Sequence, residues 1–474
     1  MPPVPSGIAA CSAGLVAELR KRHQIDVYTD EPPAAPAPGT SSAHAFVSRH
    51  RINPYDLTVY QVGNSSHHDY LWPYLFRYPG LTVLHDAHLH HARAAALLRT
   101  KRAGDYRAEF AANHPGVPHD LAELAVAGFD NHLYYSWPMT RLVVEASRLT
   151  AVHAPSLARQ LKEDLPHAAV AAIRLAHGEL LGEDRVRRAR SQVRAAHGIS
   201  DEAVVFGVFG GLTPEKRLAQ VFDALAAILP YAPSAHLLLA GAAARHYAVA
   251  ADVRARGLQG RTTITGYLDT EAGLTDCIAA CDVSLNLRWP TAREISGPWL
   301  RALAAGRPTV TMDLEHLVDV PALDPRTWRS LPGSGMRAPG SDPERRSERA
   351  GLPDPGSRTP DPDSDSDSRV SEPVTIAIDI LDEAHSLRAA MRRLASDPAL
   401  RATIGAAGRR YWEREHSMPH MLEDYERILA DAASRPTPRV PLPAHLVTNG
   451  DQVLQRVADE FGVGDILGMG SGRT

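Results

Sequence analysis

Residues 281–310 read CDVSLNLRWPTAREISGPWLRALAAGRPTV. This stretch predicts a buried strand (VSLNL), a polar loop, a glycine-proline turn, a helix and a further strand. Units of this kind build parallel sheets that are wrapped by helices. Because ligands bind beyond the carboxyl ends of such strands, the polar loop is the first candidate binding site.

The candidate loop carries chemically useful side chains. Arg288 and Glu294 follow the strand, and Ser296, Gly297 and Pro298 open the helix. The free backbone amides at a helix start can hold an anion or hydroxyl groups. A carboxylate beside such a site suits sugar recognition. Glu294 also has a plainer interpretation, as a solvated loop residue or as a charge that complements the helix dipole.

The preceding sequence repeats the same strand-helix logic. The runs AVVFGVFG, HLLLAG and TTITG predict strands, PTVTM predicts another, and KRLAQVFDALAAIL predicts a helix between the first two. Apolar residues at helical spacing indicate that this helix packs on a sheet. These residues are Leu218, Val221, Phe222, Leu225 and Leu229.

A second candidate segment, FGVFGGLTPEKRL, joins a strand to that helix. Gly210 and Gly211 form a flexible turn, and the helix is expected to open at Pro214 with Lys216 in its first turn. Glycines let the backbone approach a phosphate closely. The glycine spacing is neither that of the dinucleotide fingerprint nor that of a Walker loop.

The first half of the chain also alternates helical and strand patterns. A helix is predicted from Gly7 over GIAACSAGLVAELRKR, and IDVYTD, LTVYQV and LTVL predict strands. A doubly wound domain normally opens with a strand, which is missing here. Either the start codon was assigned too far downstream or the domain is truncated.

The segment VLHDAHLHHAR follows a predicted strand of this first half. It contains His85, Asp86, His88, His90 and His91. Zinc binding is one interpretation, but histidines packed in one short segment cannot all face a single centre. The alternative is that His85 is a hydrogen-bonding or proton-handling group, with Asp86 orienting it or capping the next helix.

Composition shifts predict the domain organisation. The charged stretch EDRVRRARSQVRAAHG is expected to be an exposed helix that leads from the first lobe to the second. A segment rich in Pro, Ser and Asp, including PDPDSDSDS, predicts a disordered insertion. The expected parts are a first lobe (1–180), a second lobe (181–331), the insertion (332–373), C-terminal helices that complete the second lobe and cross back to the first (374–435), and a tail (436–474).

The bulk composition is that of a globular protein, with 44% hydrophobic and 22% charged residues. A net charge of -4 gives no reason to expect nucleic acid or an anionic membrane as the main partner. The sparse cysteines Cys11, Cys277 and Cys281 predict core thiols in a reducing compartment. No run approaches the roughly 20 apolar residues that cross a bilayer. We therefore expect a cytoplasmic protein.

Taken together, these stretches resemble the family 4 glycosyltransferases, which have the α/β GT-B fold of two Rossmann-like lobes with a cleft between them. The resemblance covers roughly Pro2 to Ala433 without the insertion. Its strongest part is NLRWPTAREISGPWLRALAAGRPTV, which is similar to the family's donor-binding segment of glutamate, glycine-proline turn and helix. Glu294 matches the glutamate that contacts the hexose, whereas Arg301 and Ala302 stand where many members have a second glutamate that contacts the nucleotide ribose.

The segment GVFGGLTPEKRL resembles the family's donor-diphosphate loop. Lys216 fills the lysine position, but Gly211 stands where the family usually has an arginine. The resemblance implies that Arg217 or Arg288 compensates for that missing charge. In the first lobe, PPVPSGIAACSAGLV, VLHD and LAHG resemble acceptor-side segments, which implies site roles for Gly7, His85 and His177.

The resemblance implies transfer of a hexose from a nucleoside diphosphate sugar to an acceptor hydroxyl, with retained configuration and without a metal or other cofactor. Lys216 and loop amides would stabilise the leaving diphosphate. His85 would position the reacting sugar, and Glu294 would grip the hexose. The expected acceptor is a glycan, a glycolipid or a small molecule, and peripheral membrane contact is compatible with it.

Two other classes of function remain open at this point. The absent first strand, Gly211 and the long insertion are compatible with a catalytically weak, transferase-like module that binds a partner. Another GT-B enzyme, such as a sugar phosphorylase or a nucleotide-sugar epimerase, would use the same crevice for different chemistry.

Overall fold

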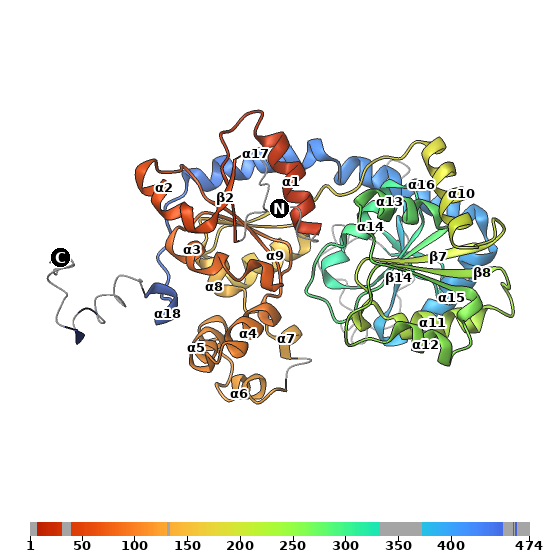
Figure 1. Cartoon of the computed structure of the whole chain (residues 1–474), viewed down its shortest axis with the longest axis horizontal. Coiled ribbons are helices and arrows are strands. Elements are labelled where there is room, and N and C mark those ends of the chain that lie inside the picture. Colours follow the sequence, from red (N-terminus) through yellow and green to blue (C-terminus); the bar gives the residue numbers. More distant parts are fainter. Residues whose placement is uncertain are drawn as a thin grey trace, which may run out of the picture. The chain divides into compact units, whose positions relative to one another are not determined.

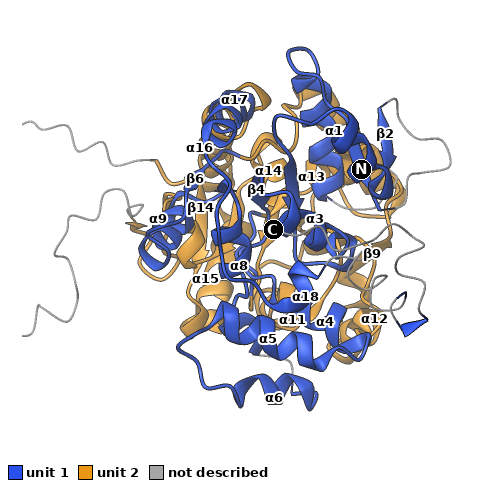
Figure 2. Ribbon diagram, turned by 90° about the vertical axis from the view of Figure 1, so that its left-hand side faces the viewer, with its two compact units in different colours: residues 1–174, 291–295, 421–474 blue, residues 175–290, 296–420 orange. Residues whose placement is uncertain are grey.

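The computed structural model describes residues 7–30, 39–129, 133–331 and 372–448, together with 458, 460 and 461. The chain divides into two compact units (Figure 2). Unit 1 comprises residues 1–174, 291–295 and 421–474, and unit 2 comprises residues 175–290 and 296–420. The first junction therefore lies before the expected boundary at 180. The predicted insertion falls almost entirely outside the described residues.

Unit 1 contains parallel strands in two separate sheets. A four-stranded sheet has the order β3-β4-β5-β6, and β1 pairs with β2 alone within the described residues. The predicted strand IDVYTD thus does not join the main sheet. The strands are β1 (Val27–Thr29), β2 (Thr40–Ser42), β3 (Val59–Val62), β4 (Leu81–Leu84), β5 (Leu149–Val152) and β6 (Val170–Ala172).

Helices surround the main sheet of unit 1, and the helix predicted from Gly7 is present as α1. Helices α4 to α7 lie in the long connection between β4 and β5 (Figure 1), and they bury a small apolar cluster of their own. The helices are α1 (Gly7–Leu19), α2 (Phe46–Ile52), α3 (Leu71–Arg77), α4 (His90–Arg99), α5 (Ala103–Asn113), α6 (Leu121–Val126), α7 (Leu133–Ser136), α8 (Arg141–Ala146), α9 (Pro155–Asp164), α17 (Met418–Ser434, from Met421 onward in this unit) and α18 (Ala444–Val447).

Unit 2 is built on a sheet of eight described strands in the order β13-β12-β14-β11-β10-β7-β8-β9. All neighbouring pairs are parallel except β12 with β13. The strand order reverses between β7 and β10, which is where doubly wound sheets bind ligands. The strands are β7 (Val204–Phe209), β8 (Ala235–Ala240), β9 (Thr262–Gly266), β10 (Val283–Asn286), β11 (Thr309–Met312), β12 (Ala322–Leu323), β13 (Ser330–Leu331) and β14 (Thr375–Ile378).

Helices cover both faces of this sheet (Figure 1). Helices α11, α12 and α15 pack on one face, and α10, α13 and α14 pack on the other. The predicted core residues Leu218, Val221, Phe222 and Leu225 are buried, and Leu229 packs against them. The helices are α10 (Glu183–Ala196), α11 (Leu218–Ile228), α12 (Val249–Ala255), α13 (Glu271–Ala280), α14 (Gly297–Ala304), α15 (Glu383–Ser396) and α16 (Pro398–Glu415).

The five strands predicted for the second lobe are present, but β14 was not expected. Its residues are fully buried, and it pairs with β11 and β12. Because the strand directly follows the Pro- and Ser-rich segment, its local sequence did not predict it. Its pairing with β11 and β12 identifies it as a strand. The predicted tail helix lies mostly outside the described residues.

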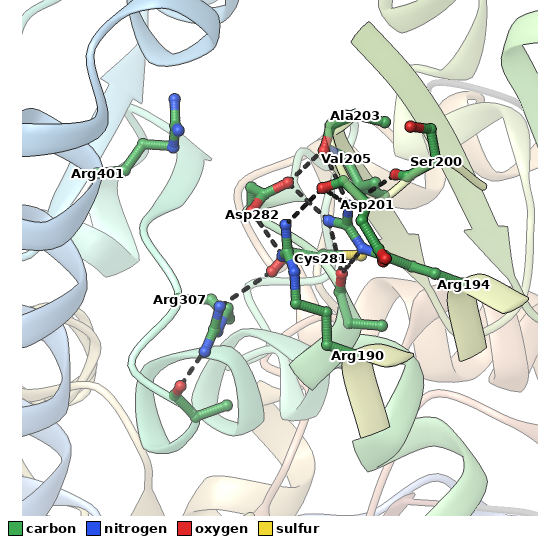
Figure 3. A network of polar contacts seen from close by, with 12 residues as sticks. Arg190, Arg194, Ser200, Asp201, Ala203, Val205, Cys281, Asp282, Arg307 and Arg401 are labelled. Atoms are coloured by element: carbon green, nitrogen blue, oxygen red, sulfur yellow. Dashed lines mark hydrogen bonds and ion pairs between the residues drawn. The ribbon is translucent and has the colours of Figure 1, made fainter. Parts of the chain in front are cut away.

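Helix α10 is less exposed than its charged sequence predicts. Arg194 is only 1% exposed and donates to Asp282 Oδ2 (2.8 Å) and to the carbonyl oxygens of Ala203 and Ala280 (Figure 3). Asp282 also accepts from Arg190 Nη1 (2.8 Å) and from the backbone N–H of Val205 (2.7 Å). Burial alone would raise the pKa of Asp282, but these partners outweigh it and hold the pKa below its ordinary value.

We expect Asp282→Ala to lower the free energy of unfolding by about 3–5 kcal/mol, because it leaves the buried Arg194 guanidinium without its counter-charge. Urea unfolding followed by circular dichroism measures this loss. Asp223→Ala is the matched control, since Asp223 pairs with Arg256 while 66% exposed. It should cost less than about 1 kcal/mol. Equal losses in the two variants would contradict the assignment.

Candidate functional site

Three residues of the predicted donor site meet at the carboxyl edge of the unit 2 sheet. Gly210 has a φ of +79°, and a Cβ built on it would lie 3.2 Å from Lys216 Nζ and 3.8 Å from Pro298 Cγ. Lys216 Nζ donates to the carbonyl oxygen of Phe209 at the end of β7. The loop after β7 and the start of α14 therefore lie against each other, with an ammonium group beside the glycine.

Arg217 has a different place from the one expected. Pro214–Lys216 form a separate 3₁₀ turn, Arg217 takes a left-handed conformation (φ 58°), and α11 starts only at Leu218. The Arg217 guanidinium pairs with Glu383, which is 8% exposed, through Nε–Oε1 (2.8 Å) and Nη2–Oε2 (2.5 Å). These hydrogen bonds raise the pKa of Arg217. The side chain braces α11 against α15, so a role at a phosphate stays a prediction.

Two further predicted donor residues are exposed in the same loops. A Cβ on Gly211 would meet no atom within 4 Å, and Arg288 follows the end of β10. The backbone N–H of Trp289 donates to the carbonyl oxygen of Glu215 (2.7 Å). This bond ties the loop after β10 to the loop after β7.

The start of α14 has the capped geometry that the sequence predicts. Ser296 Oγ accepts from the backbone N–H of Trp299 (3.4 Å), and a Cβ on Gly297 would lie 2.9 Å from His177 Nε2. His177 was expected on the acceptor side of the first lobe, but it belongs to unit 2 because the chain leaves unit 1 at Arg174. Burial, with Arg301 nearby, lowers the pKa of His177 to about 3. Its ring is neutral at physiological pH.

Glu294 lies in a short segment, residues 291–295, that groups with unit 1 rather than with the second lobe. The backbone N–H groups of Ala87 and His88 donate to the carbonyl oxygen of Ala292 (2.8 and 3.1 Å), which explains this placement. Glu294 Oε2 accepts from Thr291 Oγ1 (2.8 Å). A shared site for Glu294 and Lys216 stays a prediction.

Polar side chains also gather at the carboxyl edge of the unit 1 sheet. His85 Nε2 lies 2.7 Å from Gln61 Oε1, and the His85 and His153 ring centroids are 4.9 Å apart. Because the Gln61 oxygen can only accept, this bond needs a proton on Nε2 and makes Nδ1 the acceptor of the ring. Gln61 in turn donates to Tyr425 of α17 (3.2 Å).

Asp86 acts on the neighbouring backbone. Its Oδ2 accepts from the N–H of Asn64 (2.6 Å), and Asn64 Oδ1 accepts from the N–H of Ala92 in the first turn of α4. The expected capping of the next helix therefore runs through Asn64. Gly7 is exposed at the start of α1, and a Cβ on it would meet nothing within 4 Å.

The remaining histidines of this segment are packing residues. His90 is fully buried between Tyr106 and the carbonyl oxygen of Trp137, and burial lowers its pKa to about 3. His88 is buried and His91 stacks on Tyr134. Among the described residues, no three His, Cys, Asp or Glu side chains gather as a metal site requires. Metal independence stays a prediction.

Three residues of these clusters were not predicted from the sequence. Gln61 stands near the carboxyl end of the predicted strand LTVYQV and His153 directly follows β5, so a polar residue at a strand end was an available signal. Glu383 gave no signal, because its partner Arg217 is 166 residues away in the chain.

Residues 203–324 match the family model described as glycosyl transferases group 1. These residues resemble a glycosyltransferase domain of this group. The matched range includes the β7 loop, Lys216 and the whole of α14. It agrees with the resemblance to family 4 glycosyltransferases that the motifs indicated. No curated protein sequence matches the chain.

Similar solved structures show the fold of the chain. Sucrose-phosphate synthase from Thermosynechococcus elongatus is 14% identical with a TM-score of 0.55, over 90% of this chain and 93% of that chain. HepE from Anabaena, solved with UDP and glucose, is 14% identical with a TM-score of 0.52 (90% and 96%). WaaG, a glycosyltransferase involved in lipopolysaccharide biosynthesis, is 12% identical with a TM-score of 0.53 (90% and 96%). The expected GT-B fold is confirmed.

We expect the protein to lose stability as the pH falls from about 6.5 toward 4. Histidines of the unfolded chain take up protons near their ordinary pKa of about 6.5, whereas folded His90 and His177 stay neutral down to about 3. Each buried ring contributes a slope of at most about 1.4 kcal/mol per pH unit in this window. Urea unfolding at a series of pH values measures the slope.

His177→Gln removes one of these titrating rings, so its free energy of unfolding should depend less steeply on pH. His246→Gln in the same unit is the control, because that ring is exposed. It should keep the wild-type slope. An unchanged slope for His177→Gln would refute the neutral state of this residue.

Proposed function

We propose that the protein transfers a hexose from a nucleoside diphosphate sugar to an acceptor hydroxyl. One observation carries the proposal: Lys216, Gly210 and Pro298 converge at the point where the strand order of the group 1 domain reverses. A lysine beside a glycine turn and a helix start is suited to a diphosphate. The UDP and glucose complex of HepE, which shares the fold, supports this donor class.

In the proposed reaction, charge neutralisation of the leaving diphosphate is the main catalytic contribution. Lys216 and the amides at the start of α14 supply it, assisted by Arg288. Ser296, Gly297 and Pro298 shape the helix start, and Gly210 lets the backbone approach the phosphates. We further propose that the transfer retains the anomeric configuration and needs no metal.

The sugar-facing groups of the proposal come from residues 291–295 and from unit 1. Glu294 accepts hydrogen bonds from hydroxyl groups of the hexose, since a carboxylate can only accept hydrogen bonds. His85, whose Nε2 lies 2.7 Å from Gln61 Oε1, positions the reacting sugar in this proposal. Gly7 and Asp86 complete the acceptor side in this proposal, and Asp86 is oriented by the backbone N–H of Asn64.

The proposed acceptors are glycans, lipid-linked glycans or small hydroxyl compounds. The fold neighbours cover this range, since one is a sucrose-phosphate synthase and another acts in lipopolysaccharide biosynthesis. Within the described part of the chain, no helix has the length and apolar character to span a membrane. We propose a cytoplasmic enzyme that can contact a membrane surface peripherally.

A catalytically weak module that binds a partner is the second candidate function. Gly211 stands where the family usually has an arginine, so one positive charge that would face the diphosphate is absent. Arg217, which was expected to compensate for it, is paired with Glu383. A thermal-shift screen with nucleoside diphosphates and their sugars separates the two functions, because a ligand of the folded state raises the melting temperature. No shift with any of them would favour the binding module.

We expect Lys216→Ala and Glu294→Ala each to reduce turnover to below about 1% of wild type while the fold stays intact, since one preorganised charged group contributes roughly 10²–10³ in rate. Release of nucleoside diphosphate in the presence of acceptor measures turnover, and circular dichroism checks the fold. Lys162→Ala on α9 is the control for loss of a lysine. Normal rates in both site variants would defeat the assignment.

Gly211→Arg should strengthen donor binding, because the position is open to solvent and lies in the phosphate loop. A charge-assisted hydrogen bond to phosphate predicts a Kd lower by roughly tenfold. Calorimetric titration with the nucleotide sugar measures it. Gly260→Arg adds the same charge elsewhere in unit 2, at another site without steric hindrance. An equal gain there would show a non-specific charge effect.

A further inference from the structure

We propose that Gln61 and Tyr425 are positioning residues for the transfer reaction: together they keep the proton of the His85 ring on Nε2 and hold the ring in one orientation. The inference rests on the proposed function, because it takes His85 as the group that positions the reacting sugar. Neither Gln61 nor Tyr425 has a role in the proposed function as described above.

The sheet of unit 1 places Gln61 and His85 on one face. Gln61 lies opposite Val83 in the parallel pairing of β3 with β4. His85 is two residues after Val83, and side chains two apart in an extended segment project from the same face. The backbone N–H of His85 still donates across the sheet, to the carbonyl oxygen of Val62 (2.9 Å). The register of the sheet therefore brings His85 Nε2 to within 2.7 Å of Gln61 Oε1.

The side chain and the backbone of Gln61 are both fixed. Its Nε2 donates to the hydroxyl oxygen of Tyr425 (3.2 Å), and its backbone carbonyl oxygen lies 3.0 Å from His68 Nδ1. Because a carbonyl oxygen can only accept, His68 donates in this second contact. An amide that is hydrogen-bonded at both its oxygen and its nitrogen is restrained in rotation. Gln61 Oε1 therefore stays directed at His85.

Helix α17 anchors the far end of these hydrogen bonds. Tyr425 is 2% exposed, and burial raises the pKa of its phenol, so the hydroxyl group stays neutral. The preceding residue, Asp424, accepts from the backbone N–H and from Nε of Arg174 (both 2.8 Å). This ion pair ties α17 to the segment that follows β6, and it keeps Tyr425 beside Gln61.

The chemistry of imidazole explains why a glutamine stands at position 61. A neutral ring carries its proton on either nitrogen, and the hydrogen bond at one nitrogen decides which form is present. Gln61 Oε1 is an acceptor and selects the form with the proton on Nε2. The ring of His153 packs against the same imidazole, with the centroids 4.9 Å apart. Since an apolar pair in place of a hydrogen-bonded pair is nearly neutral for stability, the orientation of His85 accounts for the amide better than the stability of β3 does.

The protonation of His85 is the direct test. Spectra of the full chain with ¹⁵N-labelled histidine are recorded at about pH 8.5, above the ordinary histidine pKa of about 6.5. The His85 ring signals are identified by their absence from His85→Gln. We expect the proton on Nε2 in wild type and a mixture of both forms in Gln61→Leu. Gln61→Glu should keep the wild-type form, because a carboxylate also accepts from Nε2.

Turnover tests whether this orientation matters for transfer. Release of nucleoside diphosphate is followed from UDP-, GDP- or ADP-glucose, with water or octyl glucoside as the acceptor. Gln61→Leu should lower kcat by roughly 10²-fold, the cost of a misplaced reacting group, with the KM for the donor within about twofold of wild type. Tyr425→Phe should lower kcat by roughly fivefold, the factor that one neutral hydrogen bond contributes. Gln61→Glu should retain more activity than Gln61→Leu.

Tyr60→Phe is the matched control. Tyr60 precedes Gln61 on β3, is 3% exposed, and donates to the carbonyl oxygen of Tyr78 (2.9 Å). This variant removes one buried hydroxyl group, as Tyr425→Phe does, but on the other face of the strand. It should leave the protonation of His85 and kcat at wild-type values. Equal effects of the two phenylalanine variants would indicate a general loss of stability and overturn the inference.

The other outcomes separate this inference from the proposed function. A proton on Nδ1 of His85 in wild type overturns the inference, because the Gln61 amide would then donate to the ring. A mixture of both forms in Gln61→Leu with normal kcat overturns it as well, since the hydrogen bond would be structural only. The proposed function stands in both cases. If wild type releases no nucleoside diphosphate from any of the three donors, the proposed function and this inference are overturned together.

Discussion

The parallel pairing of β7 with β10 is the constraint on which the second unit depends. Phe206 and Gly207 lie opposite Val283 and Ser284, although these segments are far apart in the sequence. Gly207 permits this close packing, since a Cβ there would lie 2.6 Å from Cys281 Sγ. Because the two strands run in the same direction, their following loops leave the sheet together. This brings Gly210 and Lys216 to Pro298 at the start of α14.

Carboxylates in this protein determine which arginines are available to a ligand. Asp282 engages Arg190 and Arg194 at the amino end of β10, and Glu383 engages Arg217 beside the phosphate loop. The four lysines of the sequence include Lys216, whose Nζ is directed by a backbone carbonyl oxygen. The charge of the proposed diphosphate site is therefore set by pairing, not by the number of arginines nearby.

The chain crosses from one unit to the other after residues 174, 290, 295 and 420, and not at a single boundary. The segment 291–295 groups with unit 1 through the bonds of Ala87 and His88 to Ala292, and Ser296 returns to unit 2 as the cap of α14. Helix α17 belongs to unit 1 from Met421 onward, where Tyr425 contacts Gln61 and Asp424 pairs with Arg174. Each unit therefore consists of segments that are separated in the sequence by segments of the other unit.

Local sequence patterns predict the parallel α/β architecture, five strands of the second unit, the buried face of α11 and the glycine-lysine and glycine-proline segments. Those features depend on local periodicity and turn chemistry, which are readable in one stretch of chain. The three-dimensional structure alone shows that β14 completes the sheet, that Arg217 pairs with Glu383, that Arg301 pairs with Glu271, and that His177 and Glu294 change units. These facts arise from hydrogen bonds and ion pairs between residues distant in the sequence, and no local pattern encodes such partners.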